Sequence, residues 1–312
     1  MTRRPFDLIG GLLAMAVVAA ACGSGAPTGS ARPETSPGGT SMTEPGASAY
    51  RTATRGGVAS NAEASSAPAS TDRASTAFAA PTLPPGPLTI AALGDSLTAG
   101  DCDDSGLGGY PGRLQTLVAE LRPGSRIVNY GRSGWDSTDL INGVNGEASQ
   151  IAQAIAARPA AALVWIGSND LWNLYEYGPE PMTTAAEQTD LSAYEGNIDR
   201  ILSQLTGHGA VVFVALMDDQ SKRPVVAHPN PTEPAFPGTT PADLIRMAAH
   251  VSAYNDVIRR EAAAYGAATM DFSAVDIFTS AATLCGDGNH PNATGYDRVA
   301  QIWFAAMEPR LR

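Results

Sequence analysis

Hydrophobic residues in the later part of the chain fall into five short runs in which apolar positions follow one another without polar alternation. These runs occupy residues 88–93, 126–130, 160–166, 210–216 and 267–272. Uninterrupted apolar runs of this length are typical of strands buried on both faces, as in a parallel sheet. The pattern therefore predicts five buried strands in one parallel sheet.

Between these runs lie longer stretches in which apolar residues recur with a helical period. They cover residues 110–121, 148–157, 191–205, 242–265 and 292–307. Alternation of strands and helices is typical of α/β domains, in which the connecting helices pack on the faces of the sheet. We expect one domain over residues 88–312, folded as an α/β three-layer sandwich with helices on both sides of the sheet.

The segment 219–241 interrupts this alternation. It is rich in proline, shows no hydrophobic period and follows the end of a predicted strand. Ligands bind beyond the carboxyl ends of the strands in an open parallel sheet, so this segment is expected on the rim of the site. It is either a loop that sets specificity or a surface decoration.

The first 21 residues have the pattern of an export signal. Arg3 and Arg4 precede an apolar run over 8–21 that is shorter than the roughly 20 apolar residues of a spanning helix. The four residues ending in Cys22 resemble the lipobox of bacterial lipoproteins, in which the cysteine is acylated. We therefore predict lipidation of Cys22, and simple cleavage just before it is the alternative.

Residues 22–87 are nearly all Ala, Ser, Thr, Gly and Pro, with few large apolar side chains to bury. Such a composition predicts a disordered tether. Together with the signal it indicates an exported protein, held to the cell envelope and its membrane through lipid on Cys22 or otherwise secreted.

Bulk composition limits the partners and the size of the fold. The 312 residues are 44% hydrophobic and 16% charged, which suits one substantial core. The formal net charge of -11 disfavours a nucleic-acid partner, because such binding normally rests on clusters of Lys and Arg. We expect no nucleic-acid binding.

Ser96 follows the first predicted strand, where Gly94 permits a sharp turn into a helix. The free amides and partial positive charge of a helix N-terminus suit a nucleophilic hydroxyl. They suit a phosphate equally well, so residues 94–100 also resemble the phosphate loop of a flavodoxin-like binding protein. The Gly-x-Ser-x-Gly elbow of α/β-hydrolases does not occur in the sequence.

Asp287 and His290 favour catalysis over flavin binding. A carboxylate three residues before a histidine can accept the ring N–H and leave the other nitrogen to take a proton from a serine. The remaining histidines, His208, His228 and His250, are expected to be structural or exposed.

Two further residues at strand ends could stabilise an oxyanion. Gly134 follows the second predicted strand, where its backbone N–H could approach a substrate oxygen closely. Asn169 follows the third strand and offers a neutral side-chain donor. Taken alone, each is also an ordinary turn residue.

The segments Gly94-Asp95-Ser96-Leu97, Gly134, Gly167-x-Asn169-Asp170 and Asp287-x-x-His290-Pro291 occur in this order along the chain. Together they resemble the four blocks of the SGNH/GDSL hydrolase family. This resemblance implies a flavodoxin-like sheet and an esterase that needs no cofactor.

The same resemblance assigns a role to each block. It makes Ser96 the nucleophile, His290 the base and Asp287 the residue that orients the base. It places Ser96, Gly134 and Asn169 in the oxyanion hole.

Cysteine usage agrees with export. Acylation of Cys22 would leave Cys102 and Cys285 as an even pair in an oxidising compartment, so we expect a disulfide between them. In the fold that the resemblance implies, this bond would join the nucleophile loop to the base loop.

Two neighbouring features have weaker interpretations. Residues 101–106 resemble a calcium loop, but Gly112 stands where the closing glutamate is needed, so no metal is expected. Trp172, Tyr175 and Tyr177 follow Asn169 and could form an apolar wall against an acyl or sugar group, or they could pack under the rim.

The sequence thus predicts an exported serine esterase acting on an ester or acetyl ester, and it leaves open whether the substrate is a lipid, an aryl ester, a thioester or an acetylated sugar. The alternative is a tethered carbohydrate- or lipid-binding protein that uses the same fold.

Overall fold

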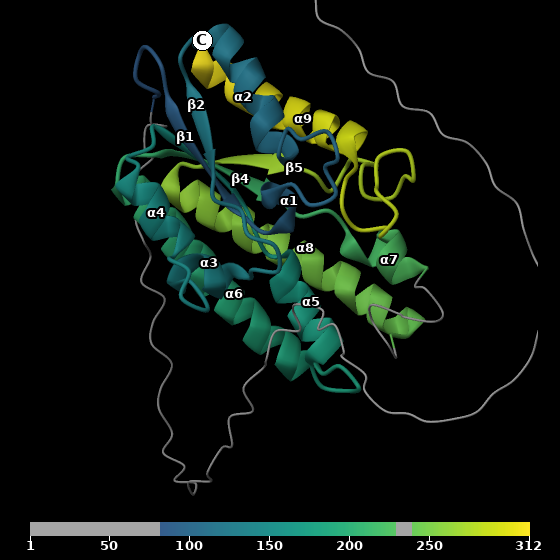
Figure 1. Cartoon of the computed structure of the whole chain (residues 1–312). Helices are drawn as coiled ribbons and strands as arrows, with labels where there is room; N and C mark the ends of the chain where they lie inside the picture. The colour runs from purple at the N-terminus through teal and green to yellow at the C-terminus, as the bar shows by residue number, and fades with distance from the viewer. Residues whose placement is uncertain (1–81, 229–238) are drawn as a thin grey trace, which may run out of the picture. The chain divides into compact units, whose positions relative to one another are not determined.

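A parallel sheet organises the residues that the computed structural model describes, 82–228 and 239–312 (Figure 1). Its strands are β1 (Thr89–Gly94), β2 (Arg126–Asn129), β3 (Ala161–Trp165), β4 (Val211–Leu216) and β5 (Ala268–Asp271). They are ordered β2-β1-β3-β4-β5, and every neighbouring pair is parallel. The predicted α/β fold and flavodoxin-like sheet are confirmed.

Helices cover both faces of the sheet (Figure 1). On one face lie α2 (Gly109–Leu121) and α9 (Ala293–Leu311). On the other lie α3 (Ser137–Asn142), α4 (Gln150–Ala156), α6 (Thr184–Gly207) and α8 (Pro241–Tyr265). Shorter helices follow the carboxyl ends of strands: α1 (Ser96–Ala99), α5 (Ser168–Tyr177), η1 (Gln220–Lys222) and α7 (Pro224–Ala227).

The central strands explain why their apolar runs are uninterrupted. Successive side chains of a strand point to opposite faces, so Ala91 and Leu93 join the core beneath α6 and α8, while Ile90 and Ala92 join the core beneath α2 and α9. Both faces are covered by helices. Every residue of β3 and β4 is therefore buried.

The edge strands differ from the prediction of burial on both faces. In β2, Arg126 and Asn129 are exposed, and in β5, Thr269 and Asp271 are exposed. An edge strand has a neighbour on one side only, so part of it remains in contact with solvent. Their short apolar runs could not reveal this position in the sheet.

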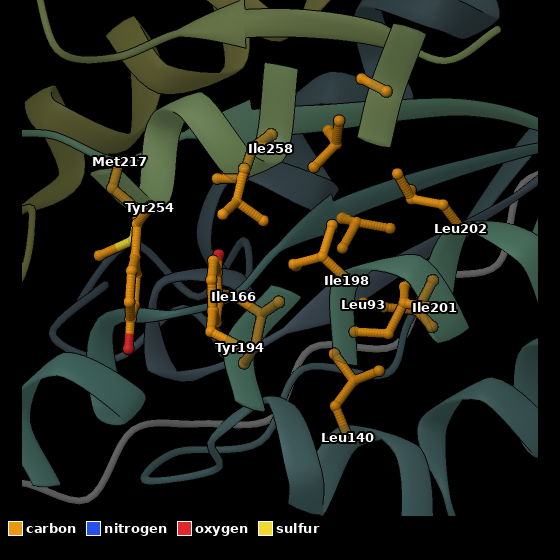
Figure 2. Packing of buried hydrophobic residues seen from close by; sticks show 14 of the residues in the cluster. Leu93, Leu140, Ile166, Tyr194, Ile198, Ile201, Leu202, Met217, Tyr254 and Ile258 are labelled. Atoms are coloured by element: carbon orange, nitrogen blue, oxygen red, sulfur yellow. The ribbon is translucent and has the colours of Figure 1, made fainter. Parts of the chain in front are cut away.

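Aromatic and aliphatic side chains fill both cores. On the α6 and α8 face, the rings of Tyr194 and Tyr254 stack with centroids 3.8 Å apart, beside Ile198 and Ile258 (Figure 2). Residue Leu83 is 9% exposed and belongs to the opposite core. Packing thus includes a residue that precedes the predicted domain start at 88.

A helix after the first strand was expected and is α1, whereas α3, α5, η1 and α7 were not among the predicted helices. Helices α1 and α3 have four and six residues, too few to show a hydrophobic period. Each begins after an aspartate whose side chain accepts a backbone N–H of the first turn, at 2.9 Å for Asp95 and for Asp136. A side-chain cap therefore marks the start of α1 and of α3.

The predictions for the N-terminal part concern residues that the structure does not describe. The export signal, Cys22 and all of the predicted tether up to residue 81 lie outside the described residues. Within 82–228 and 239–312, no helix has the length and apolar character needed to cross a bilayer.

A disulfide joins Cys102 to Cys285, as predicted, with the two Cα atoms 6.2 Å apart. Cys102 lies in the loop after α1, and Cys285 lies two residues before Asp287. The bond therefore connects the first and last parts of the site across 183 residues of sequence.

Replacing both Cys102 and Cys285 with serine should lower the free energy of unfolding by about 3 to 5 kcal/mol, because the unfolded chain gains the entropy of an open loop. Urea titration of the oxidised protein and the double variant measures the difference. The double variant leaves no unpaired thiol at the site. An unchanged unfolding midpoint would contradict the expected role of the bond.

Candidate active site

The turn after β1 places Ser96 at the start of α1. A Cβ atom at Gly94 would lie 2.2 Å from the carbonyl oxygen of Trp165, so only glycine fits this position. Asp95 caps α1 through Leu97 N–H. Ser96 therefore enters the first helical turn beyond the sheet, where β1 and β3 lie side by side.

Ser96, His290 and Asp287 form a continuous hydrogen-bonded series. Ser96 Oγ lies 2.9 Å from His290 Nε2, and His290 Nδ1 lies 2.6 Å from Asp287 Oδ2. Since an ionised carboxylate only accepts hydrogen bonds, Nδ1 carries the proton and donates it to Asp287. Nε2 is then the acceptor that faces the serine hydroxyl.

Asp287 is itself held in place by its own loop. Its Oδ1 accepts the backbone N–H groups of Asn289 and His290, at 2.8 and 3.0 Å. Partial burial would raise the pKa of Asp287, but the hydrogen bonds from the His290 ring and these two amides outweigh it. The pKa of Asp287 therefore lies below its usual value, and the carboxylate is ionised.

A pocket of about 210 Å³ opens beside Ser96 and His290, and Gly134 and Asn169 both line it. Gly134 has a φ of +78°, a backbone conformation that suits glycine. Asn169 stands in the first turn of α5, where its Nδ2 donates to the carbonyl of Trp135 at 2.8 Å. The structure thus brings all three predicted oxyanion donors to the same pocket as the predicted nucleophile and base.

Gln150 bonds the backbone of the turn that carries the nucleophile, and no sequence motif points to this residue. Its Oε1 accepts Gly94 N–H and its Nε2 donates to the Gly94 carbonyl, both at 2.9 Å. The same carbonyl accepts Arg132 N–H at 3.1 Å. The amide of a fully buried glutamine thereby extends the hydrogen bonding of β1 beyond the sheet.

Asp170 is a second positioning residue whose role the sequence did not show. Its carboxylate accepts the backbone N–H of Ser137 at 2.9 Å and also the Ser137 hydroxyl. Burial, followed by the nearby charge of Asp136, raises the pKa of Asp170 to about 7. Asp170 thus fixes the segment after Gly134 to the start of α5, which carries Asn169.

The aromatic residues near Asn169 separate into two groups. Trp172 lines the pocket, and its indole N–H donates to Gln220 Oε1 at 2.6 Å. Tyr175 does not line it, because its hydroxyl instead donates to Glu187 at 2.7 Å. Tyr177 is 64% exposed. Of the predicted substrate contacts, only Trp172 is therefore placed where a ligand at Ser96 could touch it.

Arg223 is a pocket residue that the motif search did not identify. Its side chain is almost fully buried and donates to both carboxylate oxygens of Asp218, at 2.8 and 2.6 Å. Burial disfavours the charged guanidinium, but Asp218 outweighs it and keeps the pKa of Arg223 above its ordinary value. The residue belongs to the proline-rich segment 219–241, which showed no recognisable pattern.

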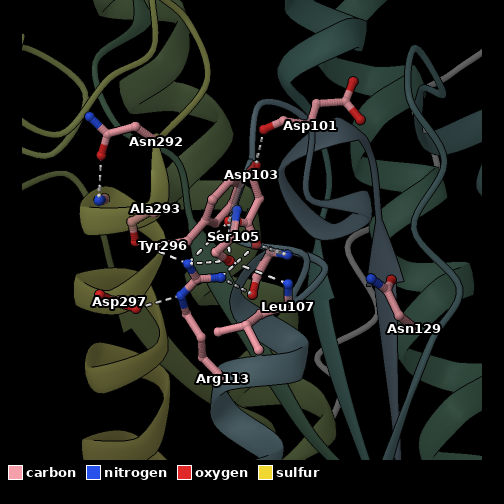
Figure 3. Close-up of polar contacts among 12 residues, drawn as sticks. Asp101, Asp103, Ser105, Leu107, Arg113, Asn129, Asn292, Ala293, Tyr296 and Asp297 are labelled. Atoms are coloured by element: carbon pink, nitrogen blue, oxygen red, sulfur yellow. Dashed lines mark hydrogen bonds and ion pairs between the residues drawn. The ribbon is translucent and has the colours of Figure 1, made fainter. Parts of the chain in front are cut away.

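The loop that resembles a calcium site is organised by an arginine. Arg113 Nη1 lies 2.6 Å from Asp103 Oδ2, and its Nε lies 2.5 Å from Asp297 on α9 (Figure 3). Ser105 Oγ donates to Asp103 at 2.6 Å. The guanidinium thus supplies the positive charge that the acidic loop needs.

The described residues offer little support for a metal site. In the part of the chain that the structure describes, the group of close cysteine, histidine or acidic side chains is Cys102, Cys285 and Asp287. The disulfide removes both thiolates from this group. None of the other three histidines is a pocket-lining residue: His250 is buried against Asp190 at 2.9 Å, His208 caps α6, and exposed His228 caps α7.

This fold and site define a carboxylic ester hydrolase domain. Residues 92–298 match the model of the GDSL-like lipase/acylhydrolase family, and the chain belongs to that family. The predicted family is confirmed, and with it the hydrolase interpretation of residues 94–100 prevails over the phosphate loop.

Several known proteins are similar to the chain. The multidomain esterase of Ruminococcus flavefaciens is 23% identical over 254 residues, and the chain spans only 29% of that protein but aligns over 73% of its own length. The acetylxylan esterase Axe2 from Geobacillus stearothermophilus matches with a TM-score of 0.50 and 20% identity, over 71% of this chain and 95% of Axe2.

A third similar protein is LAE5, an α/β hydrolase from the metagenome of Lake Arreo, Spain. It matches with a TM-score of 0.50 and 21% identity, over 73% of this chain and 97% of its own. At these identities the solved structures support the fold of the chain.

Asp170→Asn should flatten the pH dependence of stability. In the wild type the folded carboxyl keeps a proton to about pH 7, whereas the unfolded carboxyl loses it near its ordinary value of 3.8. The folded state binds more protons between these values, so the free energy of unfolding falls as pH rises through this window.

The variant lacks this titration, while Asp95, with a pKa raised by burial to about 6, remains in both proteins. Urea titrations at pH 5 and pH 7.5 should therefore show a smaller loss for Asp170→Asn, by on the order of 2 kcal/mol. Equal losses in the two proteins would exclude Asp170 as the titrating group.

Proposed function

We propose that this protein is an exported serine esterase that cleaves short acyl esters, acetyl esters above all, through an acyl-serine intermediate. The observation that carries the proposal is the hydrogen-bonded series from Ser96 Oγ through His290 to Asp287, at 2.9 and 2.6 Å. It supplies a hydroxyl, a base to take its proton and a carboxylate to stabilise the charged base.

Each step of this mechanism uses a group already in place. His290 Nε2 takes the proton of Ser96 as Oγ attacks the ester carbonyl. The backbone N–H groups of Ser96 and Gly134 and the amide of Asn169 stabilise the oxyanion. The alcohol then leaves with the proton from His290, and water hydrolyses the acyl-serine by the same route.

Pocket size and lining favour a short acyl group. The volume of about 210 Å³ is below the roughly 300 to 1,000 Å³ of typical ligand pockets. Its lining includes Leu97 and Trp172 as well as polar side chains such as Arg223, which already has hydrogen-bond partners within the protein. A long alkyl chain would exceed this volume, and the part of it left in solvent would gain nothing from burial.

The relatives support an acetylated substrate without defining it. Axe2 is an acetylxylan esterase, and the relative from Ruminococcus flavefaciens is an esterase of several domains. An acetyl group is small enough for the pocket beside Ser96, and Trp172 offers an apolar ring surface for a sugar. The alternative of a binding protein on this fold gains no support from the site, since the triad residues are in hydrogen-bond contact.

Acyl-chain selectivity tests this proposal. The specificity constant, kcat/KM, should be highest for p-nitrophenyl acetate and fall by at least about tenfold for the octanoate, because the longer chain exceeds the volume of the pocket. Ser96→Ala should be inactive, and a serine-directed phosphonate should label Ser96 in the wild type only. A preference for long chains would contradict a short-acyl pocket, and absence of turnover would contradict the esterase.

Export and anchoring form a separate part of the proposal, supported by the N-terminal sequence. If Cys22 is acylated, the mass of the mature protein from its native host should correspond to cleavage before Cys22 plus lipid, and the protein should fractionate with membranes. Cys22→Ala should then abolish lipidation. An unmodified N-terminus in secreted protein would establish simple cleavage instead, and retention of residues 1–21 would contradict the signal.

A further inference from the structure

Asn289, immediately before the base, is fixed in orientation by the buried Arg223. Besides its two bonds to Asp218, Arg223 donates from Nη1 to Asn289 Oδ1 at 2.6 Å. Its guanidinium also lies over the ring of Phe278, 4.6 Å from the centroid. The arginine is thus held on several sides, and its bond to Asn289 has little freedom to rearrange.

The chemistry of arginine decides which end of the Asn289 amide faces it. A guanidinium has donors only, so the atom at 2.6 Å must be the carbonyl oxygen and the amide NH2 must point elsewhere. That NH2 nitrogen lies 3.4 Å from His290 Nε2. Asn289 also lines the pocket, so its donors are presented beside the nitrogen that exchanges protons with Ser96.

Backbone contacts support this arrangement. Val225 N–H on α7 donates to the Gly288 carbonyl at 3.2 Å, which attaches the segment carrying Arg223 to the base loop. A Cβ at Gly288 would lie 3.1 Å from that same Val225 nitrogen. The two segments therefore pack too closely to slide past each other, and Asn289 moves with His290.

We infer that Asn289 donates a hydrogen bond to the alcohol oxygen of the ester as the bond to that oxygen breaks. After Ser96 has reacted, His290 Nε2 carries the proton destined for this oxygen. An oxygen about 2.9 Å from Nε2 can lie equally close to Asn289 Nδ2, since the two nitrogens are only 3.4 Å apart. Arg223 is the positioning residue and Asn289 the catalytic one.

The step balances without any further reactant. The carbonyl carbon–alcohol oxygen bond of the tetrahedral intermediate breaks, its electron pair stays on the oxygen, and the Nε2 proton moves to that oxygen. Asn289 keeps its own protons and stabilises the negative charge that develops during the transfer. This inference rests on the proposed esterase mechanism and assigns a group to its leaving side.

Leaving-group dependence tests the inference. A p-nitrophenolate departs with little assistance, whereas an alkoxide needs it, so Asn289→Ala should reduce kcat/KM for 2-phenylethyl acetate about 10- to 100-fold more than for p-nitrophenyl acetate. Asn289→Asp keeps an oxygen for Arg223 but removes the donor. It should show the same selective loss, which separates the missing donor from a disturbed loop.

Two matched variants complete the experiment. Asn169→Ala removes a donor to the carbonyl oxygen, so both esters should lose activity alike, by about 100- to 1,000-fold. Asn142→Ala, at the exposed end of α3, should leave both unchanged. Equal losses for the two esters in the Asn289 variants, or no loss, would overturn the inference. A wild type that cleaves neither ester would instead refute the proposed function.

Discussion

The close approach of Gly94 to the Trp165 carbonyl is the constraint on which the site depends. It lets β1 and β3 remain paired up to the point where the chain turns, so Ser96 lies just beyond the carboxyl end of β1. Gln150 then bonds both backbone groups of Gly94, and the loop leading to Gly134 bonds its carbonyl as well. The nucleophile and the loop that carries an oxyanion donor are thereby both positioned relative to the backbone of Gly94.

The remaining parts are brought to this point by buried polar contacts. Asp170 connects α3 to α5, Asn255 bonds the backbone of Met217 at the end of β4, and Arg223 connects the β4 exit to the base loop. Each of these side chains is satisfied by a specific partner, which makes a displaced loop costly. Buried polar contacts at the carboxyl ends of the strands thus hold the loops of the site in position, whereas apolar packing holds the helices against the sheet.

The sequence was sufficient for the layers and for the chemical motif residues. Apolar runs located both ends of every strand to within one residue, and the blocks identified Ser96, Asp287 and His290, whose side chains the structure brings into contact. The short helix α3 was missed because its six residues are too few to show a hydrophobic period. The sequence could not decide between the two interpretations of Tyr175, because the direction and depth of a side chain do not follow from its proximity to Asn169.

The residues that position the site could not be predicted from the sequence, for a related reason. Gln150 and Arg223 have ordinary surface residue types, and only the fold shows that they are buried beside Gly94 and Asn289. A single sequence records which residues are present but not which backbone groups would otherwise lack a partner. Which backbone groups need a side-chain partner depends on contacts between segments that are distant in the chain.

The order of the triad along the chain has a consequence for biosynthesis. Ser96 belongs to the first βα turn, whereas its base lies 194 residues later, just before the final helix. A ribosome therefore completes the strand that carries the serine long before it adds the imidazole. Until the C-terminal segment has docked, the hydroxyl is an ordinary alcohol, so the nascent polypeptide cannot attack esters while its synthesis is incomplete.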